Sequence, residues 1–108
     1  MKTMIWVTAQ FAAFHRWLDA PDDVSFLRQY HRHMFHVKVW VRVTHSDRDV
    51  EFFQFKRKLE LVIDDKLRDR EFDMSCEMIA ETLLHSLPES VAAEVSEDGE
   101  NGAIVMRG

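Results

Sequence analysis

Apolar and polar residues alternate along two stretches of the chain, a pattern that predicts two half-buried β-strands. In residues 5–15 every odd position is apolar except the last, His15. In residues 35–45 a phenylalanine and four valines alternate with mostly polar side chains. His31 and His33 have the same parity as these valines, so they share a face with them if the strand stays regular that far back.

Helical spacing replaces this alternation after the second strand and predicts two amphipathic helices. The first carries its apolar stripe at Phe52, Phe55, Leu59 and Val62. The second covers residues 75–87, where Ser75 can cap the first turn and Pro88 follows the end.

Two further strands are predicted at residues 91–96 and 103–106, joined by a turn rich in Gly and Asn at 97–102. Residues 16–30 show no period and predict an irregular connection. The order ββααββ indicates an α+β fold with a four-stranded, largely antiparallel sheet. The length fits one domain over residues 1–108, and the open edges of so small a sheet favour a homo-oligomer.

Composition and charge narrow the classes of function. The net charge is −5 with Lys and Arg scattered among acids, which argues against a nucleic-acid partner. The single cysteine, Cys76, cannot form an intrachain disulfide, and we expect a cytoplasmic protein. The apolar run at residues 4–14 is interrupted by polar residues and too short to span a bilayer, so we expect a buried strand and no membrane partner.

Three histidines form the candidate chemistry of the chain. His31 and His33 lie two residues apart on one strand face, with Cα atoms about 7 Å apart, so both imidazoles can reach one ion. His15, at the end of the other strand and on the matching parity, would complete a three-histidine site with one open position. Zinc suits such a site because it accepts imidazole ligands and is redox-inert. In a chain with six histidines, however, an H-x-H pair also arises by chance.

Five motifs follow one another in a characteristic order. They are FAAFHR at residues 11–16, HRHMF at 31–35, EFFQFK at 51–56, SCEMIA at 75–80 and the turn at 97–102. Together they resemble the family of 6-pyruvoyl-tetrahydropterin and 6-carboxy-tetrahydropterin synthases. The corresponding family motifs are an F-x-A-A-H strand, H-G-H with an aromatic, two helix starts (D-F-x-x-L-K and T-x-E-x-x-A), and a glutamate-to-glycine turn.

The resemblance implies a fold, a cofactor and an assembly. The fold is the tunnelling fold (T-fold), with two helices on one face of the sheet. His15, His31 and His33 become zinc ligands, and Glu97 takes the place of the glutamate that anchors the pterin ring through its N–H donors. Subunits of this family form rings that stack, which implies a ring of trimers or a hexamer here.

The departures from the family concern catalysis. Leu27 stands four residues before the H-x-H motif, where the family's synthases carry a catalytic cysteine. The family's L-D-H motif, whose histidine activates that cysteine, appears as I-D-D, with Asp64 retained and Asp65 in place of the histidine. We take Asp64 and Asp65 as candidate catalytic residues, with Asp65 or a zinc-bound water as the replacement base. Cys76 is more simply a partly buried helix residue than a substitute nucleophile.

Three functions remain open from the sequence. The first is a zinc-dependent carbon–oxygen lyase acting on 7,8-dihydroneopterin triphosphate or a related pterin, in tetrahydropterin or 7-deazaguanine (queuosine-type) biosynthesis. The second is a non-catalytic module that binds zinc and a pterin or purine but has lost the chemistry. In the third the ring assembly is the function, and a structural zinc is closed by a fourth protein ligand such as His36 or Glu51.

Overall fold

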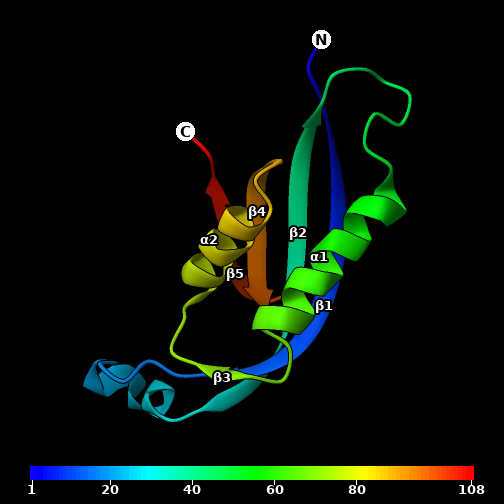
Figure 1. Ribbon diagram of the computed structural model, residues 1–108. Helices are drawn as coiled ribbons and strands as arrows, with labels where there is room; N and C mark the ends of the chain where they lie inside the picture. The colour runs from blue at the N-terminus through cyan, green and yellow to red at the C-terminus, as the bar shows by residue number, and fades with distance from the viewer.

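The two long strands expected from the alternating pattern form the centre of the sheet (Figure 1). The computed structural model describes all 108 residues, with β1 (Thr3–His15) and β2 (His31–Val43) paired antiparallel over their whole length. The odd positions of both strands face the core, and β2 stays regular back to His31. The parity predicted for the histidines is therefore confirmed.

The sheet has five strands, whereas the sequence predicted four. The C-terminal hairpin is present as predicted, as β4 (Ser90–Glu97) and β5 (Asn101–Met106). The additional strand, β3 (Glu71–Phe72), pairs parallel with the end of β1 and gives the order β3-β1-β2-β4-β5. A strand of two residues is too short to show alternation, so the sequence pattern could not reveal it.

The helices α1 (Phe52–Lys66) and α2 (Cys76–Ser86) lie on the same side of the sheet, as predicted (Figure 1). Each begins at a side-chain cap. The Glu51 carboxylate accepts hydrogen bonds from backbone N–H groups in the first turn of α1, and the Ser75 hydroxyl accepts one from the first turn of α2. The buried faces of the helices and the odd strand positions close one core, whose largest fully buried members are Phe11, Phe35, Leu59, Ile63, Leu67, Ile79 and Leu83. The stripe predicted for α1 was partly wrong: Phe52 is 57% exposed and Val62 half-buried, because the buried row follows the i, i+4 spacing of Phe55, Leu59 and Ile63.

The connection at residues 16–30 contains regular structure that the sequence did not predict. A 3-10 helix, η1 (Asp22–Arg28), occupies seven of its residues and buries none of them. Because none of its side chains is buried, the segment has no apolar period that the sequence could show. The Trp17 N–H donates to the Leu27 carbonyl over 2.7 Å, which folds the end of η1 back towards the end of β1. None of the helices is long and apolar enough to cross a membrane.

Leu59 tests the assignment of the core. We expect Leu59→Ala to lower the free energy of unfolding by about 2–5 kcal/mol, because the side chain is fully buried between α1 and the sheet and leaves a cavity. Leu61→Ala, two residues away and 69% exposed, is the matched control and should change it by less than about 0.5 kcal/mol. Urea unfolding followed by circular dichroism gives both values. Equal losses in the two variants would contradict the core described above.

Candidate metal centre

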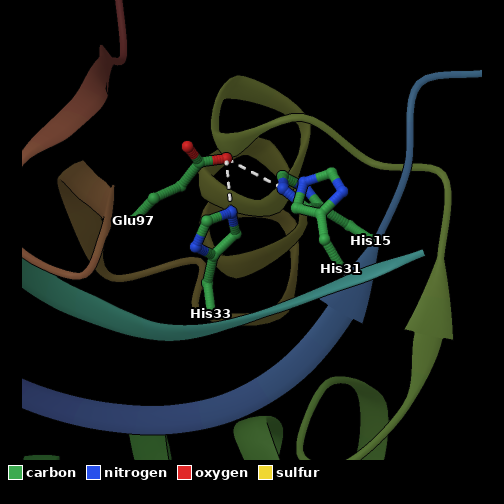
Figure 2. Close-up of side chains that lie close together, drawn as sticks. All are labelled: His15, His31, His33 and Glu97. Atoms are coloured by element: carbon green, nitrogen blue, oxygen red, sulfur yellow. Dashed lines mark ion pairs between the residues drawn. The ribbon is translucent and has the colours of Figure 1, made fainter. Parts of the chain in front are cut away.

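Three histidines meet at the end of the sheet where β1 stops and β2 begins (Figure 2). His15 is paired directly with His31 across the two strands, and His33 follows two residues later on the same face of β2. The ring centroids are 4.5 Å apart for His15 and His31, 5.2 Å for His15 and His33, and 4.9 Å for His31 and His33. The structure thus brings together the three predicted ligands.

Two buried phenylalanines pack against the histidines on the core side of the sheet. The ring of His15 packs edge-on against Phe35 at 5.2 Å, and Phe35 stacks on Phe11 at 5.3 Å. Phe11 and Phe35 are fully buried, and His15 is only 7% exposed. The histidines therefore continue the core face of the sheet, and their positions depend on the packing of that core.

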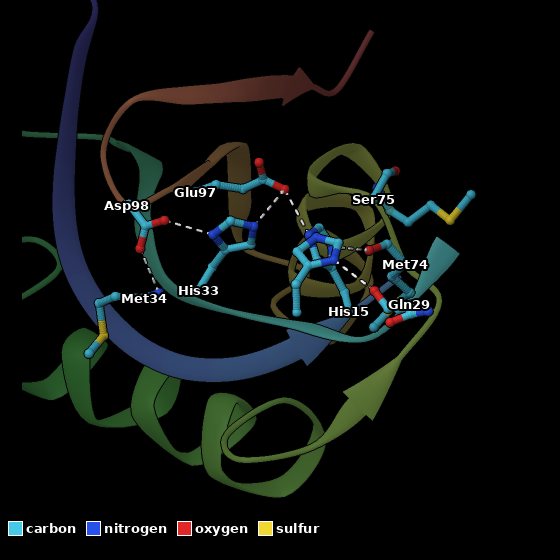
Figure 3. A network of polar contacts seen from close by, with 10 residues as sticks. His15, Gln29, His33, Met34, Met74, Ser75, Glu97 and Asp98 are labelled. Carbon is cyan, nitrogen blue, oxygen red and sulfur yellow. Dashed lines mark hydrogen bonds and ion pairs between the residues drawn. The ribbon is translucent and has the colours of Figure 1, made fainter. Parts of the chain in front are cut away.

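Each of the three imidazoles donates from Nδ1 to a protein acceptor (Figure 3). His15 Nδ1 lies 2.9 Å from the Met74 carbonyl oxygen, and His31 Nδ1 lies 2.9 Å from that of Gln29. A carbonyl oxygen only accepts, so the proton of each ring is assigned to Nδ1 and the Nε2 atom keeps a free lone pair. This is the tautomer that binds a metal through Nε2.

His31 Nε2 is buried and has no hydrogen-bond partner, and the buried Nε2 of His15 contacts only the carboxylate of Glu97. Buried nitrogen atoms without a partner are costly, and they indicate a missing ligand or ion. Burial lowers the pKa of His15 below its ordinary value, although the Met74 carbonyl and the Glu97 carboxylate act to raise it. The lowered pKa favours the neutral imidazole, which is the form that coordinates a metal.

Glu97, at the end of β4, brings a carboxylate to the same place. Its Oε2 lies 2.8 Å from His15 Nε2 and 3.7 Å from His33 Nε2. The ligand atoms of His15, His31, His33 and Glu97 all lie within 4.8 Å of one another. Three imidazoles and a carboxylate, with the buried Nε2 of His31 unpartnered among them, fit a divalent metal ion of the zinc type.

Asp98 orients His33 and was not predicted from the sequence. Its Oδ2 accepts from His33 Nδ1 over 2.6 Å, and its Oδ1 accepts from the Met34 N–H over 2.9 Å (Figure 3). These two hydrogen bonds hold the pKa of Asp98 below its ordinary value. Asp98 and Gly99 both have positive φ, 57° and 73°, so the tight turn after β4 aims the carboxylate back at β2. The Asp-Gly pair in the sequence indicates a turn, but it does not indicate that the Asp98 side chain binds His33.

A pocket of about 540 Å³ opens beside the histidines. His15, His31 and Glu97 form one end, and its other walls include Arg16, Trp17, Leu27, Asp73, Ser75 and Cys76. The volume is in the range of pockets that hold small organic ligands. Leu27 thus lies in the pocket wall, where it offers an apolar surface and no thiol.

Cys76 is also in the pocket wall but is not a thiolate. Burial raises the pKa of its thiol to about 12, and the nearby carboxylates of Glu97 and Glu77 add to the increase. The thiol is therefore protonated at neutral pH and is a poor nucleophile or base.

Asp64 and Asp65 lie apart from the histidines within the chain. Both are exposed in the last turn of α1, and neither lines the pocket. Asp64 Oδ1 accepts from Arg68 Nε over 2.7 Å, an ion pair on the helix surface. The catalytic role predicted for these two carboxylates stays a prediction.

The two residues considered as a fourth metal ligand also lie outside the group. Glu51 is the N-cap of α1, and His36 projects from the face of β2 opposite the core, beside the Gly99 turn. Glu97, predicted as a pterin anchor, is the carboxylate within reach of the imidazoles.

Comparisons with known proteins identify the fold. No family model matches the chain, and no curated protein matches it in sequence. The 6-pyruvoyl tetrahydropterin synthase of Caenorhabditis elegans superposes with a TM-score of 0.71 at 16% identity, covering 100% of this chain and 97% of that one. An uncharacterized protein from Wolinella succinogenes gives a TM-score of 0.79 at 16% identity, with 100% and 99% covered.

A third similar structure concerns a catalytic residue. It is a variant of Plasmodium vivax 6-pyruvoyltetrahydropterin synthase in which a catalytic glutamate is replaced by alanine, with a TM-score of 0.72 at 16% identity, covering 99% of this chain and 98% of that one. At this level of identity the likeness concerns the fold. The chain has the T-fold of these synthases, and the resemblance inferred from its motifs is confirmed to that extent.

Asp98 offers a test of how the histidines are positioned. We expect Asp98→Asn to raise the zinc dissociation constant about 10- to 100-fold, because the neutral amide is a weaker acceptor for His33 Nδ1. Glu100→Gln removes an exposed carboxylate from the same turn and is the matched control. Competition with a chromogenic chelator measures both affinities. An unchanged affinity in Asp98→Asn would mean that His33 needs no such support.

Proposed function

We propose that this protein is a zinc-dependent 6-pyruvoyl/6-carboxy-tetrahydropterin synthase-like protein that acts on 7,8-dihydroneopterin triphosphate or a related pterin. The observation that supports it most is the convergence of three imidazoles, each held through Nδ1, in a fold shared with 6-pyruvoyl tetrahydropterin synthases. Zinc held there would polarise a substrate oxygen and acidify the adjoining C–H or O–H group. Tetrahydropterin or queuosine-type 7-deazaguanine biosynthesis is the corresponding pathway.

The pocket beside the histidines suits a flat, polar heterocycle. Trp17, Leu27 and Met78 supply apolar surface for the faces of a ring, and Ser75 and Glu97 supply polar groups at its edge. In this proposal the Glu97 carboxylate accepts hydrogen bonds from the amino and ring N–H groups of a bound pterin. These bonds orient the side chain of the pterin towards the histidines.

The proton acceptor in this proposal is a carboxylate and not a thiolate. Leu27 has no ionisable group, and the Cys76 thiol is protonated at neutral pH. A glutamate is a catalytic residue in the Plasmodium vivax synthase, so a carboxylate can serve in this fold. We propose that Asp65, next to Asp64, takes the proton. Because neither lines the pocket of its own chain, a second copy in a homo-oligomer, a ring of trimers or a hexamer, has to supply them.

One observation favours a second candidate, the non-catalytic zinc and pterin or purine module. Leu27 stands where the synthases are expected to carry their catalytic cysteine, and the only cysteine that lines the pocket, Cys76, is protonated at neutral pH. Such a protein would keep the metal and the pocket without turning over a substrate.

Metal analysis is the first test of the proposal. We expect about one zinc per chain in the purified protein and at least tenfold less in His31→Ala/His33→Ala, since two of three imidazole ligands are then missing. His36→Ala is the matched control, because His36 lies on the same strand but on the opposite face. Absence of zinc from the unaltered protein under metal-replete conditions would refute the proposal.

Turnover of 7,8-dihydroneopterin triphosphate tests the catalytic part. Asp64→Asn/Asp65→Asn should lower turnover about 100-fold, the scale of a general base, and leave zinc content unchanged. Glu81→Gln, an exposed change on α2, is the control. Mixing the aspartate variant with His31→Ala/His33→Ala should restore turnover, because one copy then supplies the metal site and another the base. An aspartate variant as active as the parent would refute the role of Asp65, and zinc and pterin binding without turnover would support the non-catalytic module.

A further inference from the structure

We propose that Glu97 is a fourth ligand of the metal in the substrate-free protein, so that the site is closed at rest and a substrate oxygen has to displace a protein carboxylate. This inference rests on the proposed zinc site. It assigns Glu97 a second role, distinct from the contact with the pterin ring considered above.

Interatomic distances support direct coordination. Bond lengths of about 2.0–2.1 Å and tetrahedral angles place two ligand atoms about 3.3 Å apart. The distances from Glu97 Oε2 to His15 Nε2 and His33 Nε2, 2.8 Å and 3.7 Å, lie on either side of that value. All four ligand atoms are within 4.8 Å of one another, so side-chain movements of about 1 Å would bring them to tetrahedral spacing around one ion (Figure 2).

The hydrogen bonding of His15 requires a cation at this point. Its Nδ1 donates to the Met74 carbonyl, so Nε2 presents a lone pair to the lone pairs of Glu97 Oε2. Two lone pairs at 2.8 Å repel each other unless a positive charge lies between them. A metal ion bound between the two atoms would supply that charge.

The surroundings of Glu97 leave its carboxylate to the histidines. The Glu97 carboxylate makes no hydrogen bond with the backbone or with any other side chain, and its only ion pairs are with His15 and His33. Asp98, the next residue, is turned the other way and binds His33 Nδ1 from behind. The Glu97 side chain is 28% exposed towards the pocket, so it can leave the metal when a substrate enters.

Cobalt substitution combined with a small anion tests this inference. Co²⁺ reports its coordination through its visible spectrum, and azide binds where a position is open. We compare the parent with Glu97→Gln, Glu97→Ala and the control Glu94→Gln, which alters an exposed carboxylate on the same strand. Circular dichroism verifies that each variant folds. Substrate is left out, so a role in pterin binding alone would not change the readout.

We expect Glu97→Gln to raise the zinc dissociation constant at least tenfold while the stoichiometry stays at one per chain. Glu97→Ala should bind azide at least tenfold more tightly than the parent, with a new charge-transfer band, and Glu94→Gln should match the parent. Equal zinc and azide affinities in the parent and the Glu97 variants would overturn the inference and leave the proposed function intact. A parent that binds no metal would instead overturn the proposed function and this inference with it.

Discussion

The register between β1 and β2 is the constraint on which the rest of this protein depends. Side chains alternate strictly along a strand, so a slip of one residue would turn every core residue of β2 to the outside and remove both of its histidines from the site. The register is held by the buried valines of β2 and by the stacking of Phe11 on Phe35, which are opposite one another. The same packing that stabilises the sheet therefore places His15 beside His31.

Where β1 ends and β2 begins, the core face of the sheet changes from apolar side chains to the three imidazoles, and the pairing of the two strands stays regular. One buried and two half-buried imidazoles are tolerated there because each Nδ1 has an acceptor, supplied by the Met74 and Gln29 carbonyls and by Asp98. The Nε2 atoms have no comparable hydrogen-bond partner and face one another and Glu97. A site arranged in this way is less favourable without a cation, so binding of a metal ion would stabilise this end of the sheet.

The fold of this protein does not by itself determine its chemistry. The T-fold is shared with synthases that are 16% identical to it, whereas Leu27 lines the pocket at the position where the motif resemblance implies a thiol. A fold accommodates many chemistries, and the site decides among them. In this chain the site consists of three imidazoles and the Glu97 carboxylate beside a pocket whose only thiol, that of Cys76, is protonated at neutral pH.

The sequence by itself determined the long strands, the two helices, the C-terminal hairpin and the common face of the three histidines, because strand alternation and helical spacing are local. Only the tertiary structure decided the two-residue strand β3, the support of His33 by Asp98 and the approach of Glu97 to His15. Asp98 lies 65 positions from His33 in the chain. Such contacts depend on how a turn closes against a distant strand, and no local pattern encodes that geometry.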